Sequence, residues 1–199
     1  MNVIPFRHHD RSKAVPPIVF VEMFEDIPEA PCRLRPEPIM STLANCRILL
    51  DHARSAGWPL GFVVAAERAR RNVHGGLPWI DGFRPQRTDM VFETTENSCY
   101  SSEAFADAMT DAGNCYLIAG FSGECIGLAT LVEASRHGHD VGLIEDAVHS
   151  EPLSGCDAFE SHRALVAVAS SHAKILSAKG WLEIAGTPHS ELEVFDDDQ

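Results

Sequence analysis

Short apolar runs rich in β-branched residues recur along this chain, and between them apolar residues return at every third or fourth position. The short runs are typical of buried strands, whereas the wider spacing places apolar side chains on one face of a helix. The runs predict strands at residues 18–21, 60–65, 90–93, 115–119, 141–145 and 174–177. Polar caps and terminal glycines predict helices at residues 41–55, 101–111, 123–137 and 157–172.

This alternation of strands and helices predicts the fold class. Strands that are apolar on both faces are typical of a parallel sheet covered by helices on each side. Right-handed crossovers then give an α/β fold with three α/β/α layers. We expect residues 1–16 to form a flexible N-terminal arm, residues 17–182 the domain and residues 183–199 an acidic C-terminal tail.

The carboxyl ends of the predicted strands carry the candidate chemistry. Ligands of parallel sheets bind beyond these ends, so Glu22, Thr94 and the 120–125 loop are predicted to share one rim. Cys125 lies in the first turn of the helix predicted to follow this loop. Unpaired N–H groups and the helix dipole favour a nearby anion, and a helix start there would lower the pKa of the Cys125 thiol. The alternative is a small buried cysteine without a chemical role.

Composition narrows the classes of function. The chain has 199 residues, 45% of them apolar, and a formal net charge of −13. One globular core is therefore expected, and the acidic balance disfavours nucleic-acid binding. The apolar runs are too short to cross a bilayer and the N-terminus carries no signal-peptide core, so we expect a cytoplasmic protein with reduced cysteines. No motif suggests a metal or another cofactor, and a small molecule is the expected ligand.

Several motifs occur in an order and spacing that resemble a known family. They are residues 18–23, 52–60 and 89–92, Gly120, Ala129 with Thr130, Gly138, and residues 145–147. Together they make residues 18–172 similar to the isochorismatase-like cysteine hydrolases. The resemblance implies a six-stranded sheet in the order 3-2-1-4-5-6 and a homo-oligomer, a dimer or larger. It also implies a cis peptide bond between Phe121 and Ser122.

The family's chemistry uses an aspartate, a lysine and a cysteine, of which the thiolate attacks an amide-like carbon. The resemblance puts Glu22 at the aspartate position, Thr94 at the lysine position and Ile126 at the position of the nucleophile. Cys125 lies one residue earlier, about 100° away around an ideal helix. It reaches the nucleophile position only if the 120–123 turn shifts the start of the helix. The sequence leaves open which of the two side chains faces the pocket.

Aromatic and polar side chains near this rim predict a substrate pocket. Its candidate lining residues are Phe24, Trp79, Tyr100, Phe121 and Ser122. Packing under a loop is the alternative for the aromatic rings, and helix capping is the alternative for Ser122. Cys99 either lines the pocket or fills the core. The basic segment 68–74, where the family builds its pocket lid, either holds an anionic substrate or forms a solvated face.

Two functions are consistent with these residues. The first is a hydrolase of a small amide, ureide or vinyl ether, with Glu22 as the base and Cys125 as the nucleophile. The resemblance also includes members that work without the cysteine, in which the acid protonates the substrate and water is added; Glu22 alone suits that variant. The second is a catalytically inactive family member that serves as a small-molecule-binding or oligomeric interaction module. Altered residues at all three triad positions favour this alternative.

Overall fold

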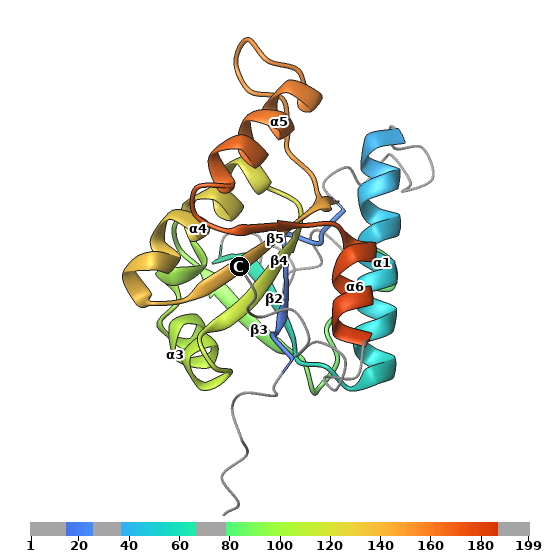
Figure 1. The fold of residues 1–199 in the computed structure, drawn as a ribbon, viewed down its shortest axis with the longest axis vertical. Helices are drawn as coiled ribbons and strands as arrows, with labels where there is room; N and C mark the ends of the chain where they lie inside the picture. Colours follow the sequence, from blue (N-terminus) through green and yellow to red (C-terminus); the bar gives the residue numbers. More distant parts are fainter. Residues whose placement is uncertain (1–14, 26–36, 67–78, 187–199) are drawn as a thin grey trace, which may run out of the picture.

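Six parallel strands form one sheet in the order β3-β2-β1-β4-β5-β6. The structure is a computed structural model that describes residues 15–25, 37–66 and 79–186. The strands are β1 (Ile18–Val21), β2 (Leu60–Ala65), β3 (Met90–Thr94), β4 (Cys115–Gly120), β5 (Asp140–Val148) and β6 (Lys174–Leu176). The predicted α/β fold and its strand order are therefore confirmed (Figure 1).

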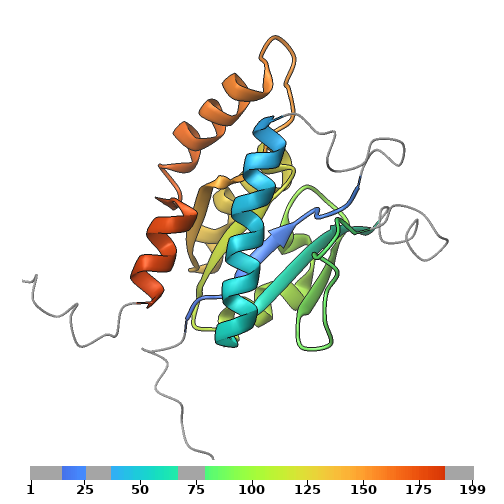
Figure 2. The same cartoon turned by 90° about the vertical axis from the view of Figure 1, so that its right-hand side faces the viewer.

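Helices cover both faces of this sheet (Figure 1, Figure 2). On one face lie α1 (Glu37–Ala56) and α6 (Ala178–Gly186), which Figure 2 turns toward the viewer. On the other face lie α3 (Glu103–Asp111), α4 (Leu128–Ala134) and α5 (Ala158–Ala169). Three short turns precede or follow these helices: η3 (Cys99–Ser101), η4 (Gly123–Gly127) and η5 (Ser135–His137). Within the described ranges, no helix has the length and apolar content needed to cross a membrane.

The central strand β1 supplies both halves of the core because its side chains alternate between the two faces of the sheet. Ile18 and Phe20 belong to the apolar cluster under α1 and α6, where the Phe20 ring lies 5.6 Å from that of Phe62. Val19 and Val21 belong to the cluster under α3, α4 and α5. All four side chains are at most 1% exposed. Such two-sided burial holds the carboxyl end of β1 rigidly in the middle of the sheet.

Two helices differ from their predicted bounds. Helix α1 begins at Glu37 rather than at residue 41, because Pro38 in a first helical turn lacks only an N–H group that would have no partner there. Helix α6 is not predicted, and it runs past residue 182, where the domain is predicted to end. Its residue Trp181 packs against the α1 side of the core, with its ring 6.3 Å from that of Trp58. The tail beyond Gly186 lies outside the described residues.

The predicted helix 123–137 is present but is not a uniform α-helix. It begins with the π-type turn η4, continues as α4 and ends with the 3-10 turn η5. Gly138 closes it with φ +68°, the left-handed conformation expected of a terminal glycine. The π-type start changes which side chains point toward the sheet at the beginning of this helix.

Candidate functional site

The parallel register brings the predicted rim residues to one edge of the sheet. Val21, the last residue of β1, is paired with Val63 on one side and with Gly120 on the other. Ala65, the last residue of β2, is paired with Thr94 at the end of β3. Glu22, Thr94 and the turn after Gly120 thus follow the ends of neighbouring strands, as the predicted topology requires.

Glu22 is held by the backbone of β2. Its side chain and backbone are only 2% exposed, and its N–H group donates to the Val63 carbonyl at 3.0 Å. The carboxylate oxygen Oε1 accepts a hydrogen bond from the Ala65 N–H group at 2.6 Å. The φ angle of Glu22 is +54°, a left-handed conformation that is uncommon for a residue other than glycine and that clusters at functional sites. The carboxylate is therefore fixed at this edge, not free to swing into solvent.

Thr94 lies on the other side of the same strand end. It is 2% exposed, and its Oγ1 donates to the Val64 carbonyl at 3.3 Å. Glu22 and Thr94 thus bond to the same peptide unit of β2, between Val64 and Ala65, from opposite sides of the strand. A hydroxyl committed to the backbone carries no charge, so Thr94 supplies none of the electrostatic effect of a lysine at this position.

The turn after β4 packs directly onto β1. Gly120 has φ +113°, and a Cβ atom there would lie 2.3 Å from the Val21 carbonyl oxygen, so only glycine fits. The Phe121 N–H group donates to that carbonyl at 2.8 Å. Ser122 takes the N-cap position with φ +58°, but its side chain makes no capping hydrogen bond, contrary to the capping alternative. Among the described residues every peptide bond is trans, and the cis bond implied between Phe121 and Ser122 is not found.

Cys125 and Ile126 point to different environments. Cys125 is exposed, whereas Ile126 is 5% exposed and packs in the core cluster with Val19 and Val63. Ile126, which the family resemblance puts at the position of the nucleophile, is thus a hydrocarbon side chain in the core.

The helix start does not lower the pKa of the Cys125 thiol. Partial burial of the sulfur and the neighbouring Glu124 carboxylate raise the pKa of the Cys125 thiol instead of lowering it. The helix start cannot compensate because its N–H groups have other acceptors: those of Cys125 and Gly127 bond to the Ser122 carbonyl, and that of Gly123 bonds to His149. A thiol in this setting is a weak nucleophile at neutral pH.

His149 is a residue of this edge that the sequence pattern does not reveal. Its N–H group donates to the Gly120 carbonyl at 2.9 Å, and its ring centroid lies 5.7 Å from that of Phe121. Its Nε2 is 3.9 Å from Glu151 Oε1. The apolar run predicts a strand that ends at residue 145, but β5 continues to Val148. The signal that could have found His149 is its place directly after the true end of a buried strand.

Two of the predicted pocket residues lie near Glu22. Phe24 follows it by two residues in the chain, and Trp79 pairs with Phe24. Phe24 and Trp79 form an isolated antiparallel bridge, and their rings are tilted by 30° with centroids 4.2 Å apart. The Trp79 ring also contacts Phe62 of β2 edge-on at 5.8 Å. Phe121 is half-buried beside His149. These rings can form an apolar wall next to the carboxylate, while the predicted basic segment 68–74 lies outside the described residues.

Tyr100 and Cys99 are placed differently from this wall. The Tyr100 hydroxyl reaches Tyr116 at 3.0 Å and His139 Nδ1 at 2.8 Å, and both partners stand at the amino ends of their strands. Tyr100 is therefore not brought together with Glu22. Cys99 is fully buried, and burial raises the pKa of its thiol to about 12, with smaller contributions from the Glu22 and Glu133 carboxylates. The core-filling alternative for Cys99 fits this burial.

The donor set at the edge does not resemble a metal centre. In the parts of the chain that the structure describes, no three histidine, cysteine, aspartate or glutamate side chains gather as a metal ion would require. What the edge offers chemically is one buried carboxylate, one histidine, an apolar wall and a backbone turn.

Comparison with known proteins identifies the same architecture. Residues 17–178 match the family model described as Isochorismatase domain. An isochorismatase from Pseudomonas putida superposes with a TM-score of 0.73 at 19% identity, covering 88% of this chain and 93% of that chain. A cysteine hydrolase from Pseudomonas syringae gives a TM-score of 0.69 at 12% identity, covering 86% and 92%. N-carbamoylsarcosine amidase from Thermoplasma acidophilum gives 0.60 at 19% identity, covering 82% and 96%. No curated protein sequence matches the chain.

Proposed function

Since this chain belongs to the isochorismatase family, we propose that it is a hydrolase that cleaves a small vinyl ether through proton transfer by Glu22. The observation that carries the proposal is the contrast between two side chains. Glu22 is buried and fixed by the Ala65 N–H group at the carboxyl edge, whereas Ile126, which the family resemblance puts at the position of the nucleophile, packs in the core. The edge thus offers an acid–base group without a thiol.

Vinyl-ether hydrolysis suits this inventory better than amide or ureide hydrolysis. An amide carbon needs a strong nucleophile and a stabilised oxyanion, and the raised pKa of Cys125 disfavours the thiolate that would attack it. A vinyl ether needs only a proton on its terminal carbon, because the ether oxygen then stabilises the resulting cation. One well-placed carboxylic acid is sufficient for that step.

The proposed reaction balances without any further reagent than water. Protonated Glu22 gives its proton to the terminal CH2 carbon of the vinyl ether, which becomes a methyl group, and an oxocarbenium ion forms. Water adds to the cationic carbon and returns a proton to the Glu22 carboxylate. The hemiketal then breaks its bond to the ether oxygen and releases an alcohol and a ketone. The Phe24 and Trp79 rings would shield the cation from bulk water.

The test compares Glu22→Gln with Cys125→Ser on small vinyl ethers, amides and ureides. Glutamine preserves the shape of Glu22 and removes only its proton transfer, so we expect kcat/KM to fall at least ~100-fold on a vinyl ether. Cys125→Ser is expected to leave turnover within ~2-fold of the wild type, because the proposal gives that thiol no role. Circular dichroism verifies that both variants fold.

Two outcomes would overturn the proposal. Loss of turnover in Cys125→Ser with activity retained in Glu22→Gln would point to a thiol hydrolase of amides or ureides. Absence of turnover of all three substrate classes by the wild-type protein would favour the small-molecule-binding module.

A further inference from the structure

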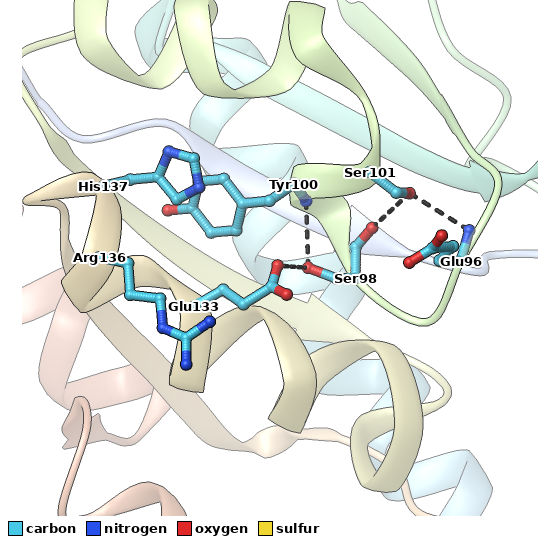
Figure 3. A pocket seen from close by; sticks show the side chains of 7 residues that line it. All are labelled: Glu96, Ser98, Tyr100, Ser101, Glu133, Arg136 and His137. Carbon is cyan, nitrogen blue, oxygen red and sulfur yellow. Dashed lines mark hydrogen bonds between the residues drawn. The ribbon is translucent and has the colours of Figure 1, made fainter.

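A cavity lies between η3 and the end of the α4–η5 helix. It encloses about 250 Å³ and shares no lining residue with the site around Glu22. Its lining residues are Glu96, Ser98, Tyr100, Ser101, Glu133, Arg136 and His137. Figure 3 shows that they come from two separate segments, residues 96–101 on one side and residues 133–137 on the other. The cavity is therefore a cleft between two elements, with both sides able to contact one occupant.

Hydrogen bonds fix the side of the cavity formed by the segment after β3. Ser98 Oγ donates to Glu133 Oε2 at 2.6 Å and accepts from the Tyr100 N–H group at 3.2 Å. Ser101 Oγ accepts from the Glu96 N–H group at 3.3 Å and donates to the Ser98 carbonyl at 2.8 Å. The positions of the serines and of the Glu133 carboxylate are thus set before any ligand arrives. Preorganised polar groups lose little entropy on binding.

Stacked rings form the back of the cavity. The Tyr100 and His137 rings are nearly parallel, at an angle of 7° with centroids 4.1 Å apart. The Tyr100 hydroxyl is held by Tyr116 and His139, so this ring cannot turn away without breaking both bonds. Burial raises the pKa of Tyr100 to about 12, which keeps the hydroxyl protonated. The stack is a rigid, flat wall.

Both signs of charge are present in the cavity. The Glu96 and Glu133 carboxylates lie on either side of Ser98 in Figure 3, and the Arg136 guanidinium lies next to the Glu133 side chain. The structure gives Arg136 no ion pair within the described ranges, in contrast to Arg54, which pairs with Asp89 at 3.4 Å. An arginine beside a carboxylate that it does not bind retains its donors for another acceptor.

We propose that this cavity binds a free α-amino acid, with the ammonium group between Glu133 and Glu96 and the carboxylate on Arg136. The charge pattern selects this class because the two functional groups of an amino acid are close together and opposite in sign, like Glu133 and Arg136. A simple anion would meet two carboxylates, which disfavours it. A metal ion would lack ligands, since no group of three ligating side chains occurs in the described part of the chain. The volume of about 250 Å³ suits a molecule smaller than a typical drug.

Calorimetric titration with L-alanine, L-leucine and L-glutamine tests the proposal. We expect saturable binding of at least one of them, and a shift of the His137 ring signals in the NMR spectrum on binding. The N-acetyl derivative of the tightest binder lacks the ammonium group, and its carboxamide lacks the carboxylate. Each is expected to bind at least ~10-fold more weakly, because each removes a charge-assisted hydrogen bond.

Two variants with matched controls locate the site. Glu133→Gln preserves the acceptor for Ser98, and Arg136→Gln removes the guanidinium; each is expected to weaken amino-acid binding at least ~10-fold. Glu103→Gln on α3 and Arg163→Gln on α5 remove the same charges elsewhere and are expected to bind like the wild type. Glu22→Gln should also bind normally, which separates this proposal from the proposed hydrolysis.

The proposal is overturned if no amino acid gives saturable binding to the wild-type protein. It is also overturned if both charge-deleted derivatives bind as well as the parent, or if Glu133→Gln and Arg136→Gln both bind like their controls.

Discussion

The carboxyl edge of the sheet and the cavity beside η3 differ in what holds their polar side chains. At the carboxyl edge, Glu22 and Thr94 bond to backbone groups of β2, and the turn after Gly120 bonds to the backbone of β1. Beside η3, the serines also bond to nearby backbone groups, but here side chains hold one another as well, as Ser98 holds Glu133 and Tyr100 holds His139.

This difference determines which changes each region tolerates. A site built on backbone contacts keeps its shape when one side chain is replaced. A network of side chains loses its shape when any one of its members is replaced, but it resists small shifts of the backbone. The carboxyl edge should therefore be most sensitive to backbone changes and the η3 region to side-chain changes.

Gly120→Ala should produce the largest effect. It changes the carboxyl edge, which is held by backbone contacts. The added Cβ would meet the Val21 carbonyl at 2.3 Å, and φ is +113°. We expect a loss of about 3–5 kcal/mol in the free energy of unfolding, measured by urea denaturation. Gly113→Ala is the matched control, since φ is +103° there but nothing lies within 4 Å of the added Cβ. It should cost only about 1–2 kcal/mol. Equal losses in the two variants would contradict the close approach of β4 to β1.

Tyr116→Phe tests the side-chain network in the same way. Tyr116 is fully buried and its hydroxyl lies 3.0 Å from that of Tyr100, so its removal leaves the partly buried Tyr100 oxygen with one partner fewer. We expect a loss of about 1–2 kcal/mol. Thr94→Val, which removes the longer 3.3 Å bond at the carboxyl edge, should cost less than about 1 kcal/mol. A larger loss for Thr94→Val than for Tyr116→Phe would reverse the comparison.

His139 determines which groups donate and which accept in this hydrogen-bond network. Thr110 Oγ1 donates to the Ala106 carbonyl, so it accepts from His139 Nε2, 3.1 Å away. The neutral ring then carries its hydrogen on Nε2 and accepts from the Tyr100 hydroxyl at Nδ1. Protonation of Nδ1 would force the Tyr100 hydroxyl to turn away. The network is thus matched to a neutral histidine.

The free energy of unfolding should consequently depend on pH through His139. Burial and the neighbouring His137 lower the pKa of His139 below its usual 6.5. The stabilisation is complete above the unfolded-state pKa and is lost as the pH falls through the folded-state pKa. We expect His139→Gln to be less stable than the wild type at pH 7.5 but to lose less on going to pH 5, by urea denaturation at both values. His162→Gln on α5 is the control and should keep the wild-type slope; a wild-type slope in His139→Gln would remove His139 from the network.

The α/β/α layers were predictable because strand and helix signals are local and strong, whereas the order of the strands was implied only by the family resemblance. The runs at 18–21 and 60–65 carry no polar side chain, and this two-sided burial is typical of a covered parallel sheet. The missed helix α6 shows the limit. Its apolar positions include Trp181, but they are close to an acidic tail, and only the packing against Trp58 reveals that they are buried.

Only the part of the site that follows from the sheet topology was predictable. Strand ends place Glu22 and Thr94 together without any knowledge of side chains. The orientation of Cys125 depends on the π-type turn, which no spacing rule encodes, and the role of Tyr100 depends on contacts with Tyr116 and His139 that lie far away in the chain. Periodicity predicts which side chains share one face of a helix or strand. Tertiary packing determines which residues meet across the sheet.

Thiol labelling should give the smallest effect, and it tests whether any reactivity remains in the carboxyl edge. The exposed Cys125 has a pKa raised by partial burial and by Glu124, so less of it is thiolate at pH 7. Glu124→Gln removes the like charge, which should lower this pKa and speed the reaction with iodoacetamide by ~2–3-fold. Peptide-resolved mass spectrometry follows Cys125 alongside Cys156, an exposed thiol of the same chain whose rate should not change. If Cys125 reacts far faster than Cys156 in the wild-type protein, the turn does activate a thiol, and the contrast between a carboxyl edge that retains only Glu22 and an η3 region rich in paired side chains would have to be abandoned.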